Sequence, residues 1–574
     1  MRKSIVVLLI GLLMIGTVGM VQANEELANL PREKTLYMAG EQWSAPATFN
    51  PLAGVSDWPV AAAADVLIYE TLFAMNMVTS ELDPLLATGY EWTDDLTLQV
   101  TMDGKAHWQN GDPLTAEDVE YTFDLASKYP LEYSNIWDVI TDVEMVDEAT
   151  VEFTLNPDNP NRLLLLHQLA FTRILPKAIF TKVEEENNND IAEIRKWKNR
   201  EAIGSGPYTI ASYSDQRIVL QRDENYWGNA NWGKPAPKYI AHVIYKSNDA
   251  GNRALEAGQV DISQQFIPQV WKMWEDKNLP IHTWYDEPPY YVSSRMPSLI
   301  VNTTKKPMDD PAFRRALAHA IDYQKIAQLA MTQYSSTMQA GLIMPTEPYF
   351  DKTEVEQYGW KYDPDKAVEI LEEAGYYIGT DGFYRTPDGE EISLTAQCPY
   401  GWSDWMVSLK IVAQSARDIG INIREKFPET PVWDEELRSG DFDLTMEVPT
   451  GMATPANPWL RFRNSVYSVG VPEIGGLAFR NWGRYKNEKA DELIERLPLL
   501  SDEVELQATY NELNRLVMEE APIIPLEYRP WLFYTYSTQY WTGFANEENP
   551  YAPPQMGATG AGIRILYNLE PVAQ

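Results

Sequence analysis

The chain has 574 residues, and its 83 acidic and 47 basic side chains give a formal net charge of −36. This acidity argues against nucleic acid or anionic lipid as a partner and favours a neutral or cationic ligand. The length predicts two or three domains, the single cysteine, Cys398, excludes an intrachain disulfide, and five scattered histidines do not suggest a zinc site, so we expect no metal and no cofactor.

Residues 1–23 read as a cleaved signal peptide. Arg2 and Lys3 form a short basic region, residues 5–20 are almost entirely apolar, and Ala23 supplies the small residue found at signal-peptidase sites. The apolar run is short for a membrane span, and an uncleaved anchor is the alternative interpretation. No cysteine near this site could carry a lipid, so we expect a soluble protein in the periplasm of a two-membrane bacterium.

The first part of the mature chain reads as strands followed by a helix. Residues 35–39 predict a strand, and apolar residues alternate with polar ones over residues 96–100. Thr115 and Asp118 then have the spacing of a capping box at a helix start. The stretch from 83 to 123 that contains this unit holds no nucleophile, metal cluster or phosphate-binding loop, so it predicts a scaffold.

The middle of the chain alternates short strands and turns. A polar surface loop is predicted at residues 184–190, and a glycine-rich turn follows at 204–208. That turn lacks the Lys-Ser/Thr of a phosphate-binding loop, so we reject that function for it. The next predicted elements are strands at 218–222 and 239–245, a helix at 252–257 and a strand at 260–262.

The second half of the chain predicts an α/β domain. Asp310 and Asp363 each precede a proline and cap a predicted helix. A strand at 392–398, a helix at 406–419 and a strand at 421–427 form a βαβ unit, for which parallel pairing is expected. Further strands are predicted at 299–302, at a domain crossing, and at 442–446.

These segments resemble one family along almost the whole mature chain. The stretch 83–123 with its run GDPLTAEDV, the turn GSGPY at 204–208 and the YWG at 226–228 are similar to the signature of the peptide/nickel/oligosaccharide class, family 5, of extracytoplasmic solute-binding proteins of ABC transporters. The resemblance implies an α/β, two-lobe periplasmic-binding-protein (type II) fold with an extra subdomain in lobe I. Residues 521–528 resemble the family's return crossing between the lobes. The implied segments are lobe I at 24–72, 203–298 and 530–574, the extra subdomain at 73–202, and lobe II at 299–529.

The resemblance implies ligand capture and no catalysis. A monomeric receptor would bind its solute between the lobes and deliver it to ABC transporter permease subunits. Residues 236–245, 267–271 and 399–405 are similar to the cello-oligosaccharide-binding branch known from thermophilic bacteria, which favours β-linked gluco- or manno-oligosaccharides such as cellobiose. An oligopeptide or dipeptide receptor is the alternative, but the loop at 448–459 lacks the acidic residue that peptide binders carry there.

A secreted glycoside hydrolase is an alternative from a different class. Such an enzyme needs two carboxylates about 5–10 Å apart across a cleft, and acidic residues are too numerous here for their spacing to indicate a pair. A turnover assay on cello- or manno-oligosaccharides separates this alternative from a receptor. We therefore predict no catalytic residue and no metal ligand.

The predicted ligand-binding residues are mostly aromatic and amide side chains that follow strands or lie in loops, where ligands of such folds bind. Tryptophan faces can stack on sugar rings, and each tryptophan can alternatively be part of the core. Asp404 can alternatively cap a helix, and Asn302 can alternatively make a hinge hydrogen bond. The predicted set is Trp43, Asn50, Trp58, Trp271, Asn302, Tyr400, Trp402, Asp404, Trp405, Trp433, Asn457 and Trp459.

Overall fold

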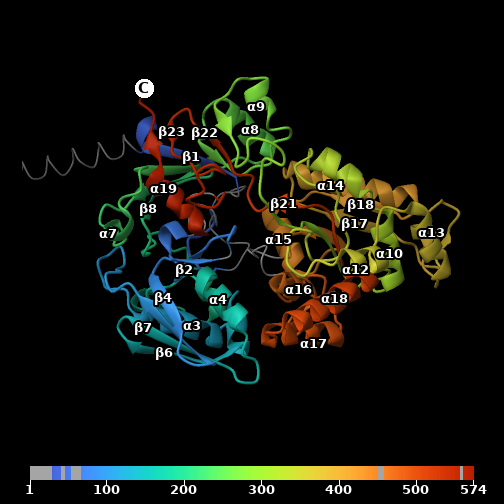
Figure 1. The fold of residues 1–574 in the computed structure, drawn as a ribbon, viewed down its shortest axis with the longest axis horizontal. Helices are drawn as coiled ribbons and strands as arrows, with labels where there is room; N and C mark the ends of the chain where they lie inside the picture. Colours follow the sequence, from blue (N-terminus) through green and yellow to red (C-terminus); the bar gives the residue numbers. More distant parts are fainter. Residues whose placement is uncertain are drawn as a thin grey trace, which may run out of the picture.

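The computed structural model shows two lobes with a further domain packed below the first (Figure 1). Each of these three parts is built around its own β-sheet. In the described part of the chain, no helix has both the length and the apolar character needed to cross a membrane. The structure describes residues 27, 29–40, 46–53, 66–79, 81–449, 458–555 and 560–573.

The first lobe contains a seven-stranded mixed sheet whose strands come from three distant parts of the chain. The predicted strand at 35–39 is confirmed as β1, which pairs in parallel with β10 and β11, while the outer strands pair antiparallel. In spatial order the strands are β12 (Ile281–His282), β22 (Thr535–Ser537), β11 (Ile262–Ser263), β1 (Thr35–Ala39), β10 (Tyr239–Val243), β9 (Arg217–Arg222) and β8 (Tyr208–Tyr213).

The extra subdomain contains a four-stranded antiparallel sheet covered by helix α3 (Ala116–Lys128). Leu98 and Val100 are fully buried on one face, as their alternation with polar residues predicts. The predicted capping box of Thr115 and Asp118 is confirmed at the start of α3. The strands are β4 (Ala87–Trp92), β5 (Thr97–Met102), β7 (Thr150–Leu155) and β6 (Ile140–Asp147), and the other helices are α4 (Arg162–Phe171), α5 (Lys177–Glu186) and α6 (Ile191–Ile194).

The second lobe contains a five-stranded sheet, and helices pack on it. The predicted βαβ unit is confirmed, because β17 and β18 pair in parallel and α14 connects them in the sequence. In spatial order the strands are β18 (Ile423–Lys426), β17 (Leu394–Gln397), β19 (Leu444–Glu447), β14 (Ser298–Val301) and β20 (Ile523–Pro525). The main helices are α10 (Pro311–Ala320), α12 (Lys352–Tyr358), α13 (Pro364–Glu373), α14 (Ser403–Asp418), α15 (Thr430–Ser439), α16 (Trp459–Val466), α17 (Glu488–Arg496) and α18 (Glu503–Glu520).

Two strands carry the chain between the lobes. β13 (Ser293–Arg295) leads into β14, β20 leads into β21 (Arg529–Pro530), and β13 pairs antiparallel with β21. In Figure 1, β21 lies between the two lobes. The predicted return crossing at 521–528 is therefore confirmed, and the crossing strands provide the connection about which the lobes can rotate.

The predicted polar loop at 184–190 is wrong in its first part. Helix α5 extends to Glu186, and Glu184 is buried. The Glu184 carboxylate accepts hydrogen bonds from the hydroxyls of Tyr121 (2.6 Å) and Tyr129 (2.9 Å). Because these partners lie more than fifty residues away in the sequence, the local composition gave no sign of them.

Shorter elements connect the main sheets and helices. The predicted helix at 252–257 begins earlier, since Ser247 caps it. These elements are β2 (Phe73–Met75), β3 (Leu82–Pro84), α7 (Asn229–Trp232), α8 (Asn248–Glu256), α9 (Lys272–Glu275), α11 (Tyr323–Lys325), β15 (Tyr377–Ile378), β16 (Tyr384–Arg385), β23 (Trp541–Thr542), α19 (Ile565–Asn568) and β24 (Glu570–Pro571).

Candidate ligand-binding cleft

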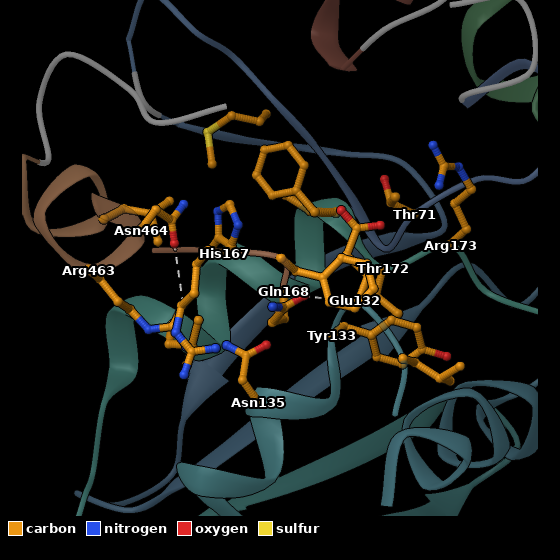
Figure 2. A pocket seen from close by; sticks show the side chains of 18 of the residues that line it. Thr71, Glu132, Tyr133, Asn135, His167, Gln168, Thr172, Arg173, Arg463 and Asn464 are labelled. Carbon is orange, nitrogen blue, oxygen red and sulfur yellow. Dashed lines mark hydrogen bonds between the residues drawn. The ribbon is translucent and has the colours of Figure 1, made fainter. Parts of the chain in front are cut away.

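A cavity of about 500 Å³ lies between the subdomain and the second lobe. Helix α4 and the loop at 131–135 line it on the subdomain side, and Figure 2 shows side chains of both pointing into the same space. The ends of α15 and β19, helix α16 and the loop at 479–482 line it from the second lobe. Arg295 of β13 and Trp531, which follows β21, complete the lining from the crossing strands. The cavity therefore touches every part that a rotation of the lobes would move.

The charges of this cavity are opposite to the charge of the whole chain. The charged side chains that line it are Arg173, Arg195, Arg295, Arg438, Arg463, Arg480, Glu132 and Glu447. Six cations against two anions give a positive site in a chain of net charge −36. The expectation that the ligand is neutral or cationic, which came from the net charge, does not take this local arrangement into account.

Arg463 lies on α16 with only 7 % of its surface exposed. Burial and the neighbouring Arg480 cation lower the pKa of Arg463 to about 9. Its Nη1 donates a 3.5 Å hydrogen bond to Oδ1 of Asn464 (Figure 2). Across the cavity, burial and the Arg463 charge lower the pKa of His167 to about 3, so this imidazole is neutral near pH 7.

Glu447 is the acidic group at the end of β19. Burial raises its pKa to about 7, although the backbone N–H of Val448 and the charges of Arg295 and Arg438 oppose the shift. Arg438 also pairs with Asp434 at 3.0 Å on its own helix. Glu447 can therefore gain or lose its proton near neutral pH, which changes the charge of the cavity by one.

Uncharged polar and aromatic side chains complete the lining. Oγ1 of Thr172 donates a 3.1 Å hydrogen bond to Oε1 of Gln168, and both lie beside Tyr133 in Figure 2. Hydroxyl and amide groups suit a ligand with many hydrogen-bonding groups, and flat rings suit stacking. The aromatic lining residues are Tyr133, Phe171, Phe479, Trp482 and Trp531.

Among the predicted ligand-binding residues, Trp43, Trp58 and Asn457 lie outside the described residues. Asn50 is buried beside the cavity, and its amide is engaged internally. Its Nδ2 donates to the carbonyl of Ile194 at 2.8 Å, and its Oδ1 accepts from the backbone N–H of Leu52 at 3.0 Å. Its neighbours Pro51 and Leu52 line the cavity.

Asn302 makes its hydrogen bonds inside the second lobe, at the end of β14 that lies away from the crossing strands. Its Nδ2 donates to the carbonyls of Gly440 (3.0 Å) and Phe442 (2.9 Å), and its side chain is fully buried. Its Oδ1 accepts from Thr304. Asn302 therefore fixes the loop before β19 and does not line the cavity.

Trp402 and Trp405, which follow β17, form a cluster with Trp433 of α15. The ring centres of Trp402 and Trp405 are 4.8 Å apart, and those of Trp402 and Trp433 are 5.9 Å apart. Trp405 and Trp433 are buried, and Nε1 of Trp433 donates to Thr445 at 3.0 Å. The cluster packs α14 against α15 and does not line the cavity.

The turn that carries these tryptophans contacts the first lobe. The backbone N–H of Asn248 donates to the carbonyl of Gly401 at 3.1 Å, and Asp404 pairs with Arg529 at 2.9 Å. Asp404 lies in the first turn of α14 and is not its N-cap, which is Trp402. Tyr400 is half exposed on the same turn. The turn after β17 therefore contacts both the first lobe and a crossing strand.

The remaining two predicted residues pack inside their own domains. Trp271 stacks on Tyr290 with ring centres 5.5 Å apart. Trp459 is buried at the start of α16, and its Nε1 donates to the carbonyl of Ile494 at 2.8 Å. Neither lines the cavity.

The arginines of the cavity were missed because they lie far apart in the sequence and follow no motif. Glu447 could have been predicted from the sequence. It directly follows the strand predicted at 442–446, and ligand-binding residues were expected just after strands. Glu447 lies one residue before the loop at 448–459, where an acidic residue was sought and not found. No group of residues in the described part of the chain has the composition of a metal site.

Known proteins are similar to this chain in fold and, at 25–32% identity, in sequence. A crystal structure of a mannohexaose-bound oligopeptide ABC transporter, periplasmic oligopeptide-binding protein, from Thermotoga maritima has a TM-score of 0.86 and 32% identity, covering 95% of this chain and 100% of that chain. The glutathione-binding protein of Salmonella choleraesuis is 26% identical over 471 residues, which are 80% of this chain and 82% of that protein. The periplasmic oligopeptide-binding protein of Escherichia coli is 25% identical over 500 residues, 80% of this chain and 83% of that protein.

The family follows from a match that covers about two thirds of the chain. Residues 81–467 match the family described as bacterial extracellular solute-binding proteins, family 5. The two-lobe architecture and the cavity between the lobes agree with this match. The chain therefore belongs to family 5 of the bacterial extracellular solute-binding proteins.

Proposed function

We propose that the chain is a periplasmic receptor that binds oligosaccharides between its lobes and delivers them to an ABC permease. The observation that carries this proposal is its similarity to the Thermotoga maritima protein that holds mannohexaose, at 32% identity over nearly the whole chain. The glutathione-binding protein of Salmonella choleraesuis and the oligopeptide-binding protein of Escherichia coli are 25–26% identical. Residues 1–23 would be the signal peptide, and the mature protein would be a monomer with the lobe limits predicted from the sequence.

Binding would act by lobe closure and without chemistry on the ligand. Aromatic side chains from the subdomain, Tyr133 and Phe171, and from the second lobe, Phe479 and Trp482, face the same cavity. A sugar held by both sides would favour the closed arrangement by its differential affinity for that state. Trp43, Trp58 and Asn457 stay predicted ligand contacts.

A peptide receptor is the second candidate, and a specific observation favours it. Glu447 lies in the cavity and could bind the amino group of a peptide. The sequence interpretation had found no acidic residue for this role in the loop at 448–459. Arg295 and Arg438 act electrostatically on the same carboxyl group, so a peptide ammonium would compete with two existing cations. This competition places the peptide proposal second.

A ligand panel tests the two candidates. The thermal midpoint of the purified protein should rise with β-linked gluco- or manno-oligosaccharides, because a ligand that binds only the folded state stabilises it. The panel contains cellobiose, longer cello-oligosaccharides, mannobiose and mannohexaose beside di- to tetrapeptides. A shift with peptides alone would reverse the ranking, and release of shorter sugars from the oligosaccharides would contradict a receptor.

A further inference from the structure

We propose that the ligand carries carboxylate groups, and specifically that the receptor prefers acidic oligosaccharides made of uronic acids over neutral ones. This inference rests on the proposed function and names the substrate class within it. The first reason is the positive charge of the cavity. Its lining contributes six arginines and two glutamates, although the whole chain has a net charge of −36. Such a local reversal attracts anions into the cleft.

The second reason is the contrast between two arginines on the same helix. Arg461 is fully buried, and its guanidinium forms two hydrogen bonds of 2.6 and 2.7 Å to the carboxylate of Glu347. Arg463, two residues later, is nearly as buried, and among the described residues it forms no ion pair. A buried cation without a counter-charge is costly. Glu347 therefore neutralises Arg461, whereas Arg463 lines the cavity and can bind an anionic ligand.

The third reason is that a second guanidinium lies beside Arg463. The guanidinium carbons of Arg463 and Arg480 lie 5.9 and 5.5 Å from the centre of the same Tyr467 ring. Arg480 likewise forms no ion pair with a described carboxylate, and Asp138 acts on both arginines only at longer range. Each guanidinium carries a fork of N–H donors that a carboxylate can accept in a bidentate manner, and the second cation adds to the attraction for an anion.

Neutral polar groups also lie near this arginine pair. His167 is uncharged near pH 7, and Asn135 and Asn464 present amides toward the same space in Figure 2. Amides can bind the hydroxyls of a sugar ring while the arginines bind its carboxylate. The combination fits a sugar acid better than inorganic phosphate, because it provides donors and acceptors together and not donors alone.

Matched sugars test this proposal on the full mature protein. Isothermal titration compares β-1,4-mannotriose with the mannuronate trimer of the same linkage, and cellotriose with its counterpart oxidised to carboxylates at C6. We expect at least one uronate trimer to bind ten-fold or more tightly than its neutral partner at low salt, with the preference shrinking as salt rises. Neutral trimers that bind as tightly overturn this inference and leave the oligosaccharide function intact. Binding of acidic peptides without any trimer overturns both.

Substitutions assign the effect to the arginine pair. Arg463→Gln should weaken uronate binding 10- to 100-fold and weaken neutral-sugar binding by a clearly smaller factor. Its thermal midpoint should stay equal or rise, since an unpaired buried charge is removed. Arg461→Gln on the same helix should lower the midpoint, and exposed Arg424→Gln in β18 should change neither property. Equal losses for uronate and neutral sugars in Arg463→Gln would contradict carboxylate recognition.

Arg480→Gln keeps the test decisive if Arg463→Gln does not fold. Arg480 is only partly buried, so its substitution should leave the fold intact and still weaken uronate binding about ten-fold. Unchanged uronate binding in a folded Arg480→Gln protein would contradict the assignment of the arginine pair.

Discussion

At the scale of single residues, burial sets the protonation state of several carboxyl groups. Glu70 is fully buried, and it accepts hydrogen bonds from the hydroxyl of Tyr226 (2.5 Å) and from Nε1 of Trp227 (3.0 Å). Burial outweighs these donors and raises the pKa of Glu70 to about 8. Such a group holds a proton at neutral pH, unlike an exposed glutamate.

The raised pKa of Glu70 predicts a stability that falls with pH. Between its ordinary value of 4.5 and about 8, folded Glu70 holds a proton that the unfolded chain releases. The free energy of unfolding therefore decreases as pH rises through this window. Glu70→Gln cannot titrate, so the stability of the variant relative to wild type should grow with pH, by at most about 1.4 kcal/mol per unit.

Urea unfolding of both proteins at pH 5, 6.5 and 8 measures this effect. The other buried carboxyl groups, such as Glu527, titrate equally in both proteins and cancel in the comparison. A stability difference that does not change with pH would show that Glu70 is already ionised at pH 5.

At the scale of elements, Asp118 at the start of α3 accepts more hydrogen bonds than its capping motif predicts. Besides the backbone N–H of Thr115 (3.1 Å), the Asp118 carboxylate accepts from Nε1 of Trp108 (3.3 Å) and the backbone N–H of Lys177 (2.9 Å). The side chain thus connects the β-turn before the helix, the helix itself and the start of α5.

Substitution of Asp118 should therefore destabilise the subdomain more than loss of an ordinary cap. Asp118→Ala leaves three buried or half-buried donors without this acceptor, and we expect a loss of about 2–4 kcal/mol. The adjacent Glu117→Ala removes only an exposed ion pair with Lys177, worth about 0.5 kcal/mol. Denaturant unfolding compares the two variants, and equal losses would contradict the role of Asp118 as a connector.

The tryptophan cluster between α14 and α15 also belongs to this scale. Because Trp405 is buried against Trp402 and Trp433, Trp405→Ala should cost about 3–5 kcal/mol through the cavity it leaves. Ligand affinity of the folded variant should stay within a few-fold of wild type. Titration calorimetry measures the affinity and thermal unfolding measures the stability. A loss of affinity without a loss of stability would support the predicted role of Trp405 in stacking on a sugar.

Much of the element order could be predicted, because it follows from local patterns. The βαβ unit of β17, α14 and β18 and the capped helices α10 and α13 lie where periodicity and capping residues indicated. Glu184 was assigned to a loop because its two tyrosine partners come from α3 and from just beyond its end. The end of β17 was chosen for the ligand because strand ends lie near clefts, but that rule does not say which strand end another lobe covers.

At the scale of the whole molecule, acidity is a property of the surface and not of the cleft. Mutual repulsion among excess acidic groups destabilises the folded state at low ionic strength. We expect the thermal midpoint of the ligand-free protein to rise by several degrees between about 10 and 300 mM sodium chloride, as the Debye length falls from about 30 Å to below 10 Å. A midpoint that stays constant or falls would contradict net repulsion.

The sequence by itself determined the family, the alternation of helices and strands and the total charge, because each is carried by local patterns or by composition. Only the tertiary structure decided which side chains meet in the cleft. Arg295, Arg438, Arg463 and Arg480 are spread over almost two hundred residues, and lobe packing brings them to one cavity. Net charge adds over the chain regardless of position, whereas the field inside a cleft depends on which few charges are near, so the acidic sequence and the positive site are compatible.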